Sequence, residues 1–229
     1  MKIILSGGGK PEETLELDRF FLNLVKNGNV LFIPIAKTTR TPKECYEWVS
    51  NIFKNLNFKG KMKLLSNLKG MNYAKIKKFD AIYLGGGNTF HLLKEIKLAN
   101  FDNVLKKYIY GKGIIYGISA GAVIFCKDIK YVKEIGDINN DNLVDTSALN
   151  ILKDTYIWPH YNLIQDDRIG EMVDREKVNI LGIPEGAGVY IVNEEVYVQA
   201  GEVFLFSKNK KYLFRKGEKI PQIQLNSIQ

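Results

Sequence analysis

The stretch from Gly113 to Cys126 constrains the fold more than any other part of the chain. A short apolar run at 114–116 leads directly into Gly117-Ile-Ser-Ala-Gly121, and a second apolar stretch follows at once. A buried strand that turns through a glycine-flanked serine into a buried helix is the nucleophile-elbow pattern. The turn is too sharp for side chains on either flank, and it holds the serine near free N–H groups that can stabilise an oxyanion. We therefore predict that Ser119 is a nucleophile, the alternative being an ordinary strand–turn–helix junction.

Strands and helices alternate along the chain before this serine. Apolar runs predict strands at 2–6, 30–35, 62–65 and 81–84. Helical patterns follow at about 11–25, 42–56, 73–77, 89–96 and 101–108. The alternation predicts an α/β fold, a three-layer sandwich in which helices cover both faces of a mostly parallel sheet. Loops at the C-terminal ends of such strands build functional sites, so the serine turn and the glycine-rich segment 85–89 are both candidates.

The second half of the chain has a different pattern. Residues 128–150 are polar and indicate an excursion from the core, whereas residues 166–177 have a helical pattern. Alternating apolar and polar positions predict antiparallel strands at 188–193, 195–200, 203–207 and 211–215. The lysine-rich patch at 208–219 fits the solvent face of the last hairpin. With no repeat and no linker, residues 1–229 are expected to form a single domain with a C-terminal antiparallel hairpin region.

Composition and charge exclude several classes of function. The 229 residues are 45% hydrophobic, enough for a sizeable core, and no apolar run approaches the roughly 18–20 residues of a membrane helix. The first apolar segment, 1–6, is too short for a signal peptide. The net charge of +8 comes from lysines spread along the chain, which does not indicate nucleic-acid binding. Cys45 and Cys126 do not suggest a disulfide framework, so a cytoplasmic protein is expected.

A serine nucleophile needs a base, and the chain has only two histidines. His91 lies within a predicted helix, whereas His160 lies where an apolar segment breaks at a proline into a polar loop. By elimination, His160 is the candidate base. Glu185, in a glycine-rich turn between apolar segments, is the candidate carboxylate that orients the histidine, and Asp141 and Asp145 remain alternatives. Two histidines without a Cys/His cluster make a poor ligand set, so neither a metal nor a cofactor is expected.

The order serine, histidine, glutamate differs from that of the α/β-hydrolases, in which the acid precedes the histidine. It is the order found in class I glutamine amidotransferase-like folds, whose nucleophile is cysteine. Three motifs narrow the comparison: Leu84-Gly-Gly-Gly-Asn-Thr-Phe-His-Leu-Leu93, Gly117-Ile-Ser-Ala-Gly-Ala122 and Trp158-Pro-His-Tyr-Asn162. Through these motifs the chain resembles the peptidase E family of serine peptidases, which includes aspartyl dipeptidase and its cyanophycinase relatives. The resemblance covers most of the chain.

The resemblance implies a serine peptidase that hydrolyses dipeptides or short peptides, with Ser119 as nucleophile and His160 as base. Glu185 matches a glutamate described as the third member of the triad, while some descriptions of the family place an aspartate in the region of Asp141. The resemblance also implies that the oxyanion hole and substrate-binding groups come from Ala120 and from Gly86-Gly87-Asn88.

The segment after the histidine loop departs from the Gly-Glu-Thr-Arg type found in aspartyl dipeptidase. Arg168 in this segment can meet an acidic substrate group, so a preference for an acidic or polar N-terminal residue is expected. A non-catalytic small-molecule binding protein on the same scaffold is the competing function, because a fold alone does not guarantee chemistry. We expect a monomer or homodimer that acts on a peptide substrate and binds neither nucleic acid nor a membrane.

Overall fold

The computed structural model describes residues 1–208, 210–221 and 223–226. Its larger sheet has seven strands in the order β3-β2-β4-β5-β1-β8-β9. The strands are β1 (Lys2–Ser6), β2 (Asn29–Ile33), β3 (Lys61–Leu64), β4 (Ala81–Leu84), β5 (Ile114–Ile118), β8 (Gly188–Val192) and β9 (Glu195–Ala200). β1 to β5 are parallel, and β8 and β9 add an antiparallel edge. The predicted α/β fold with a mostly parallel sheet is confirmed.

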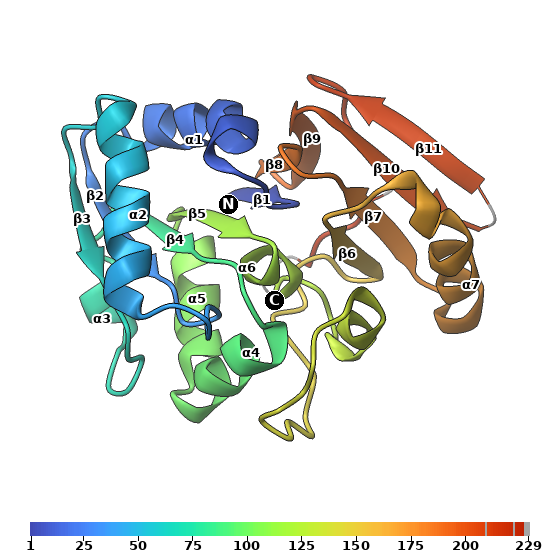
Figure 1. Ribbon diagram of the computed structural model, residues 1–229, viewed down its shortest axis with the longest axis horizontal. Helices are drawn as coiled ribbons and strands as arrows, with labels where there is room; N and C mark the ends of the chain where they lie inside the picture. The colour runs from blue at the N-terminus through green and yellow to red at the C-terminus, as the bar shows by residue number, and fades with distance from the viewer. Residues whose placement is uncertain (209, 222, 227–229) are drawn as a thin grey trace.

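Helices cover both faces of the larger sheet (Figure 1). One face carries α1 (Pro11–Val25) and α2 (Pro42–Asn55), and the other carries α3 (Tyr73–Ile76), α4 (Thr89–Leu98) and α5 (Phe101–Tyr110). Successive residues of a strand point to opposite faces, so each strand contributes to both cores. In β1, Ile4 packs in the cluster that contains α1 and α2, whereas Ile3 packs with α4 and α5. The predicted layers of helix, sheet and helix are present.

Local sequence signals set the starts of α1 and α2. Both helices have a proline at the first helical position, where its missing N–H group and fixed φ angle are tolerated. Thr41 caps α2 by accepting a hydrogen bond from the Glu44 N–H group, and the Glu44 carboxylate accepts one in return from the Thr41 N–H group. The two prolines and the Thr41–Glu44 cap thus set where α1 begins after β1 and where α2 begins after β2.

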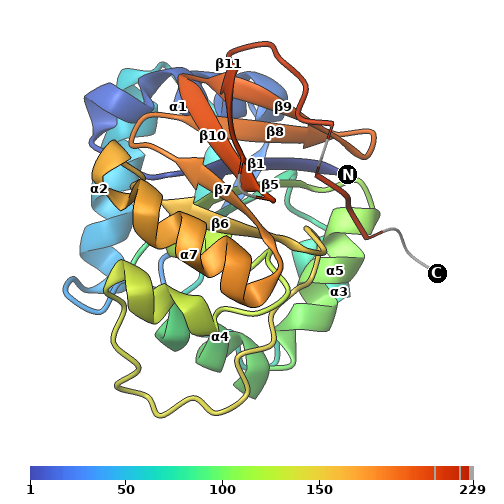
Figure 2. The same cartoon turned by 90° about the vertical axis from the view of Figure 1, so that its right-hand side faces the viewer.

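A smaller four-stranded sheet lies beside the larger one, in the order β11-β10-β7-β6. Its strands are β6 (Thr155–Pro159), β7 (Asn179–Ile183), β10 (Glu202–Ser207) and β11 (Lys210–Arg215). β6 and β7 are parallel, whereas β10 and β11 run antiparallel to their neighbours. Helix α7 (Asp166–Glu176) connects β6 to β7 and packs on β7 and β10 (Figure 2).

The C-terminal strands form where the sequence predicted them, but they do not make one hairpin region. The β8–β9 hairpin extends the larger sheet, whereas β10 and β11 belong to the smaller one. The reason lies in pairing. β8 pairs with the free edge of β1, and β10 pairs with β7 through contacts such as Leu205 opposite Leu181. Asn209, part of the predicted lysine-rich hairpin, lies outside the described residues.

The polar excursion after the serine turn contains a 3₁₀ helix (Lys130–Ile135) and returns to the core at its end, where Leu149 is buried. Its middle part lies along α4, as the hydrogen bonds described below show. Across the described residues, 1–208, 210–221 and 223–226, we find no helix with the length and apolar character needed to span a membrane.

Candidate active site

Ser119 lies between β5 and the short helix α6 (Ala120–Val123). Its backbone has φ 50° and ψ −113°, a conformation that is strained for a residue with a side chain. A Cβ atom added to Gly117 would lie 2.3 Å from the carbonyl oxygen of Gly121, and one added to Gly121 would lie 2.4 Å from that of Leu84. Close packing of α6 on the sheet therefore requires both glycines, which is the steric reason for the sequence pattern.

Two hydrogen bonds join three side chains at this turn. Ser119 Oγ lies 2.9 Å from His160 Nε2, and His160 Nδ1 lies 2.9 Å from Glu185 Oε1. The side chains of His160 and Glu185 are 44% and 47% exposed, so the chain of hydrogen bonds is open to solvent. This is the relation of nucleophile, base and orienting carboxylate that acyl-transfer chemistry needs.

The smaller sheet carries both the histidine and the glutamate. His160 directly follows β6, and Glu185 lies two residues beyond the end of β7. β6 and β7 are parallel neighbours, with Pro159 opposite Ile183, so their C-terminal ends meet at the same edge. The two side chains are thereby brought within hydrogen-bonding distance although 25 positions separate them in the sequence.

A glycine loop from the larger sheet holds these two turns together. The His160 N–H group donates to the Gly7 carbonyl at 3.1 Å, and the Gly186 N–H group donates to the Gly8 carbonyl at 2.9 Å. A Cβ atom added to Gly8 would lie 2.6 Å from His160 Cε1, and the φ angle of Gly8 is 94°. The sequence analysis did not assign this loop to the site. The signal was present, because three consecutive glycines follow β1 at the same sheet edge as Ser119.

Backbone groups lie beside the serine on its other flank. Ala120 opens α6, and a Cβ atom added to Gly86 would lie 3.2 Å from Ser119 Cβ. Gly87 has a φ angle of 148°, and a Cβ atom there would lie 2.1 Å from the Ala36 carbonyl oxygen, so only glycine fits. The loop after β4 is thus pressed against both the serine turn and the loop after β2.

The Asn88 side chain serves a structural purpose. It accepts a hydrogen bond from the His91 N–H group at 2.9 Å, which caps α4, and it donates to the Ile138 carbonyl at 2.8 Å. Both ends of this amide are therefore occupied by protein groups. The sequence made Asn88 a candidate for substrate binding; in the structure its side chain caps α4 and bonds the excursion.

Two further candidates from the sequence lie outside the hydrogen-bonded chain. Asp141 bonds His91 Nδ1 at 2.8 Å and Lys94 Nζ at 2.7 Å, because the excursion lies along α4. Arg168 on α7 lies 3.7 Å from Glu134, on an element that is not part of the cavity wall described next. The structure therefore places neither Asp141 beside His160 nor Arg168 beside the nucleophile.

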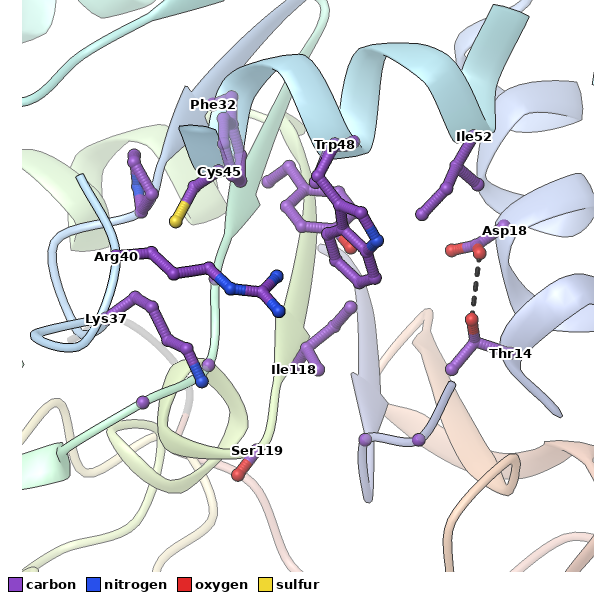
Figure 3. A pocket seen from close by; sticks show the side chains of 18 of the residues that line it. Thr14, Asp18, Phe32, Lys37, Arg40, Cys45, Trp48, Ile52, Ile118 and Ser119 are labelled. Carbon is purple, nitrogen blue, oxygen red and sulfur yellow. Dashed lines mark hydrogen bonds between the residues drawn. The ribbon is translucent and has the colours of Figure 1, made fainter. Parts of the chain in front are cut away.

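A cavity of about 420 Å³ extends from Ser119 and His160 toward the gap between α1 and α2 (Figure 3). Two cationic side chains, Lys37 and Arg40, reach into it from the loop after β2. The indole of Trp48 projects from α2 into the middle of the cavity. The sequence analysis missed both cations. The rule that singled out residues 85–89, namely that loops after parallel strands build sites, also applies to the loop after β2.

The opposite side of the cavity is formed by α1, which contributes Thr14 and Asp18. Asp18 is 2% exposed, and burial raises its pKa from an ordinary value near 3.8 to about 6. Among the residues that the structure describes, no group of three or more His, Cys, Asp or Glu side chains is placed so that it could hold a metal ion.

A strained serine on a strand-to-helix turn, bonded to a histidine that a carboxylate orients, is the arrangement of a serine-type hydrolase. Over residues 3–199, the chain matches the family described as Peptidase family S51. The protein belongs to this family and is a serine-type peptidase.

Several known proteins are similar to this chain. A curated peptidase E from Nostoc sp. is 29% identical over 216 residues, covering 89% of this chain and 81% of that protein. An uncharacterized peptidase of Listeria monocytogenes is 29% identical, covering 77% of this chain and 88% of its own length. The crystal structure of a putative peptidase E protein from Listeria monocytogenes superimposes with a TM-score of 0.70 at 27% identity, covering 87% of this chain and 98% of that one. The predicted resemblance to peptidase E is confirmed.

Proposed function

We propose that this peptidase cleaves dipeptides or short peptides through Ser119, His160 and Glu185. The observation that supports the proposal is the pair of 2.9 Å hydrogen bonds linking the three side chains. Ser119 Oγ attacks the scissile carbonyl carbon while His160 Nε2 takes its proton, and the same nitrogen then protonates the leaving amine. Water attacks the acyl-enzyme in the second half of the reaction. Glu185 orients the imidazole and stabilises its protonated form.

The oxyanion of each tetrahedral intermediate is assigned to two backbone N–H groups, those of Ala120 and Gly86. Ala120 lies at the start of α6, where N–H groups lack partners within the helix. Gly86 lies against the Ser119 side chain, as the 3.2 Å approach of an added Cβ atom indicates. Donors held rigidly at such a position are worth about 2.7–4 kcal/mol each in serine peptidases.

For the substrate, we propose an acidic or polar N-terminal residue held by Lys37 and Arg40. Both side chains enter the cavity that begins at Ser119, and no ion pair with an Asp or Glu of the described residues occupies either of them. A guanidinium and an ammonium together suit a carboxylate, which the guanidinium can bind with two hydrogen bonds. This assignment replaces Arg168, which is paired with Glu134.

We also propose that the whole chain is one class I glutamine amidotransferase-like domain. A single hydrophobic cluster supports this proposal, because it joins residues of both sheets, such as Ile115 of β5 with Ile157 of β6 and Leu205 of β10. A cytoplasmic location is proposed on the ground that Cys45 and Cys126 are both free thiols.

Labelling by a fluorophosphonate probe tests the serine chemistry directly. We expect the wild-type protein to be labelled at Ser119, as located by peptide mass spectrometry, because only an activated serine reacts. Ser119→Ala should lose both labelling and peptidase activity, while its free energy of unfolding stays within about 1 kcal/mol of wild type. Ser147→Ala is the matched control and should keep both labelling and activity. Ser147 lies on the excursion and bonds Asp145 and the Lys97 side chain of α4. An unlabelled wild type, or activity that survives in Ser119→Ala, contradicts the proposal.

A further inference from the structure

Asp18 is a buried carboxylate at the end of the cavity opposite Lys37 and Arg40 (Figure 3). Thr14 Oγ1 donates a hydrogen bond to Asp18 Oδ2 at 3.0 Å. Asp18 Oδ1 has no hydrogen-bond partner among the described residues. The Tyr116 hydroxyl lies close enough to lower the Asp18 pKa, but the two groups do not meet normal hydrogen-bond geometry. One oxygen of a carboxylate that is only 2% exposed, on the wall of the cavity, therefore has no donor in normal geometry within the described residues, and no cation pairs with it there.

Such a group is costly to the fold. Burial raises the Asp18 pKa to about 6, against smaller lowering effects of Thr14 and Tyr116, so Asp18 is largely ionised at neutral pH in an apolar setting. Within the described residues Asp18 forms no ion pair, and Trp48, Ile52 and Tyr83 line the same cavity. A carboxylate in this position destabilises the protein unless a ligand supplies the missing cation.

We propose that Asp18 is the anchor for an ammonium group of the peptide substrate. This inference rests on the proposed function, since it assigns a specificity residue within the same cavity. An ammonium group offers three donors and a positive charge, which is what an ionised carboxylate with one unused oxygen can accept. The rings of Trp48 and Tyr83 line the approach and favour a cation over an anion.

The cavity therefore carries opposite charges on its two sides: cations from the loop after β2 on one side and a carboxylate from α1 on the other (Figure 3). A short peptide with a free N-terminal amine and an acidic side chain has the complementary charges. A calcium ion does not fit, because one carboxylate and one threonine hydroxyl fall short of the six to eight oxygen ligands that calcium takes.

Peptides of different lengths test the anchor and measure its distance from the nucleophile. We would assay fluorogenic amides carrying one, two or three residues before the scissile bond, each with a free or an acetylated N-terminal amine. Each added residue moves the amine by roughly 3.3–3.6 Å. At the length that reaches Asp18, wild-type kcat/KM should favour the free amine by roughly ten- to hundredfold, the worth of one charged hydrogen-bonded contact.

Asp18→Asn should bring this ratio close to one, because an amide keeps the Thr14 hydrogen bond but lacks the charge. Glu16→Gln is the matched control: it makes the same change on the same helix, at a carboxylate paired with Lys216 outside the cavity, and should keep the ratio. Asp18→Asn should also raise the melting temperature, whereas loss of a merely structural carboxylate would lower it. A ratio unchanged in Asp18→Asn overturns the anchor, whatever happens to stability.

A failure of the proposed function can be told apart from a failure of the anchor. If the wild type cleaves none of the amides, the proposed substrate class is wrong. Binding of the same free and acetylated peptides to Ser119→Ala, measured by calorimetry, then tests the anchor without turnover. Tighter binding of the free amine that disappears in the Ser119→Ala/Asp18→Asn double variant supports it, and equal binding of the two forms overturns it.

Discussion

The two histidines of this chain lie in two regions that differ in whether the charged side chains nearby form ion pairs. His91 and His160 each bond a carboxylate through Nδ1, at 2.8 Å and 2.9 Å. Along α4, the basic side chains are paired with carboxylates of the excursion. Asp141 bonds both His91 and Lys94, and Asp145 bonds Lys97. Around the cavity, by contrast, Lys37, Arg40 and Asp18 form no ion pair within the described residues. A hydrogen bond to a carboxylate is therefore not enough to identify a catalytic base. His160 differs from His91 in also bonding the Ser119 hydroxyl.

Changing the carboxylate of each histidine–carboxylate pair to an amide should give the largest difference in kcat. Glu185→Gln should lower kcat by up to about 10⁴-fold, because an amide favours the wrong imidazole tautomer, as it does when it replaces the triad aspartate of other serine proteases. Asp141→Asn should lower kcat less than tenfold, since it affects only the packing of the excursion on α4. Steady-state kinetics on one peptide substrate measure both. The reverse ranking would show that the excursion supplies the orienting carboxylate.

We expect the next largest effect from removing the unpaired arginine of the cavity, compared with removing an arginine that is paired with a carboxylate. Arg40→Ala should reduce the preference for an acidic N-terminal residue by roughly ten- to hundredfold, the worth of one charged contact. Arg168→Ala, whose guanidinium faces Glu134, should leave this preference unchanged. The ratio of kcat/KM for Asp-Leu to that for Ala-Leu measures the effect. Equal ratios in wild type and Arg40→Ala would remove Arg40 from substrate recognition.

Asp18→Asn should stabilise the protein, because it removes a buried charge without a cation. A pKa that rises from about 3.8 in the unfolded chain to about 6 in the fold corresponds to a cost of about 3 kcal/mol at neutral pH. The cost is fully present above pH 6 and vanishes below about pH 3.8, where the carboxyl is neutral in both states. Urea unfolding at pH 7 and at pH 3.5 should therefore show a gain for Asp18→Asn only at pH 7. A loss of stability at pH 7 would mean that Asp18 has a cation partner in the fold.

Asp145→Asn should have the opposite sign and the smallest size. The hydrogen bond from Lys97, followed by that from Ser147, lowers the pKa of Asp145 to about 2. The contact stabilises the fold above the ordinary pKa near 3.8, and this contribution is lost as the pH falls toward 2. Because the group is exposed, the substitution should cost less than about 1 kcal/mol at pH 6. Parallel unfolding curves at pH 6 and pH 2 test this, and a cost that persists at pH 2 would rule out the ion pair as its source.

Most of the fold could be predicted from the sequence because local and global signals agree. The buried strands are continuous apolar runs, and α1 and α2 each have a proline at the first helical position. What the sequence did not reveal is which sheet each C-terminal strand joins. The choice depends on which strand edges are free after the rest has packed, as with β1 for β8 and β7 for β10, and no local pattern records that.

The hydrogen-bonded chain was easier to predict than the cavity. Ser119 lies in a turn whose steric demands are visible as glycines, and His160 and Glu185 each follow an apolar strand. Lys37 and Arg40 looked like two of many surface cations, because the sequence does not show which lysines and arginines point into a cavity. Asp18 lies on an otherwise ordinary helix, where its burial becomes apparent only when α1 is placed on the sheet.

Ser119 follows a strand of one sheet, whereas His160 and Glu185 follow strands of the other. Ser119 follows β5 of the larger sheet, and His160 and Glu185 follow β6 and β7 of the smaller sheet. Backbone hydrogen bonds from the loop at Gly7–Gly9 join the two sheets at this point. A chain in which both sheets have formed but have not docked would have its full secondary structure and an inert serine. The chemistry proposed for these three side chains therefore requires both sheets to be in place.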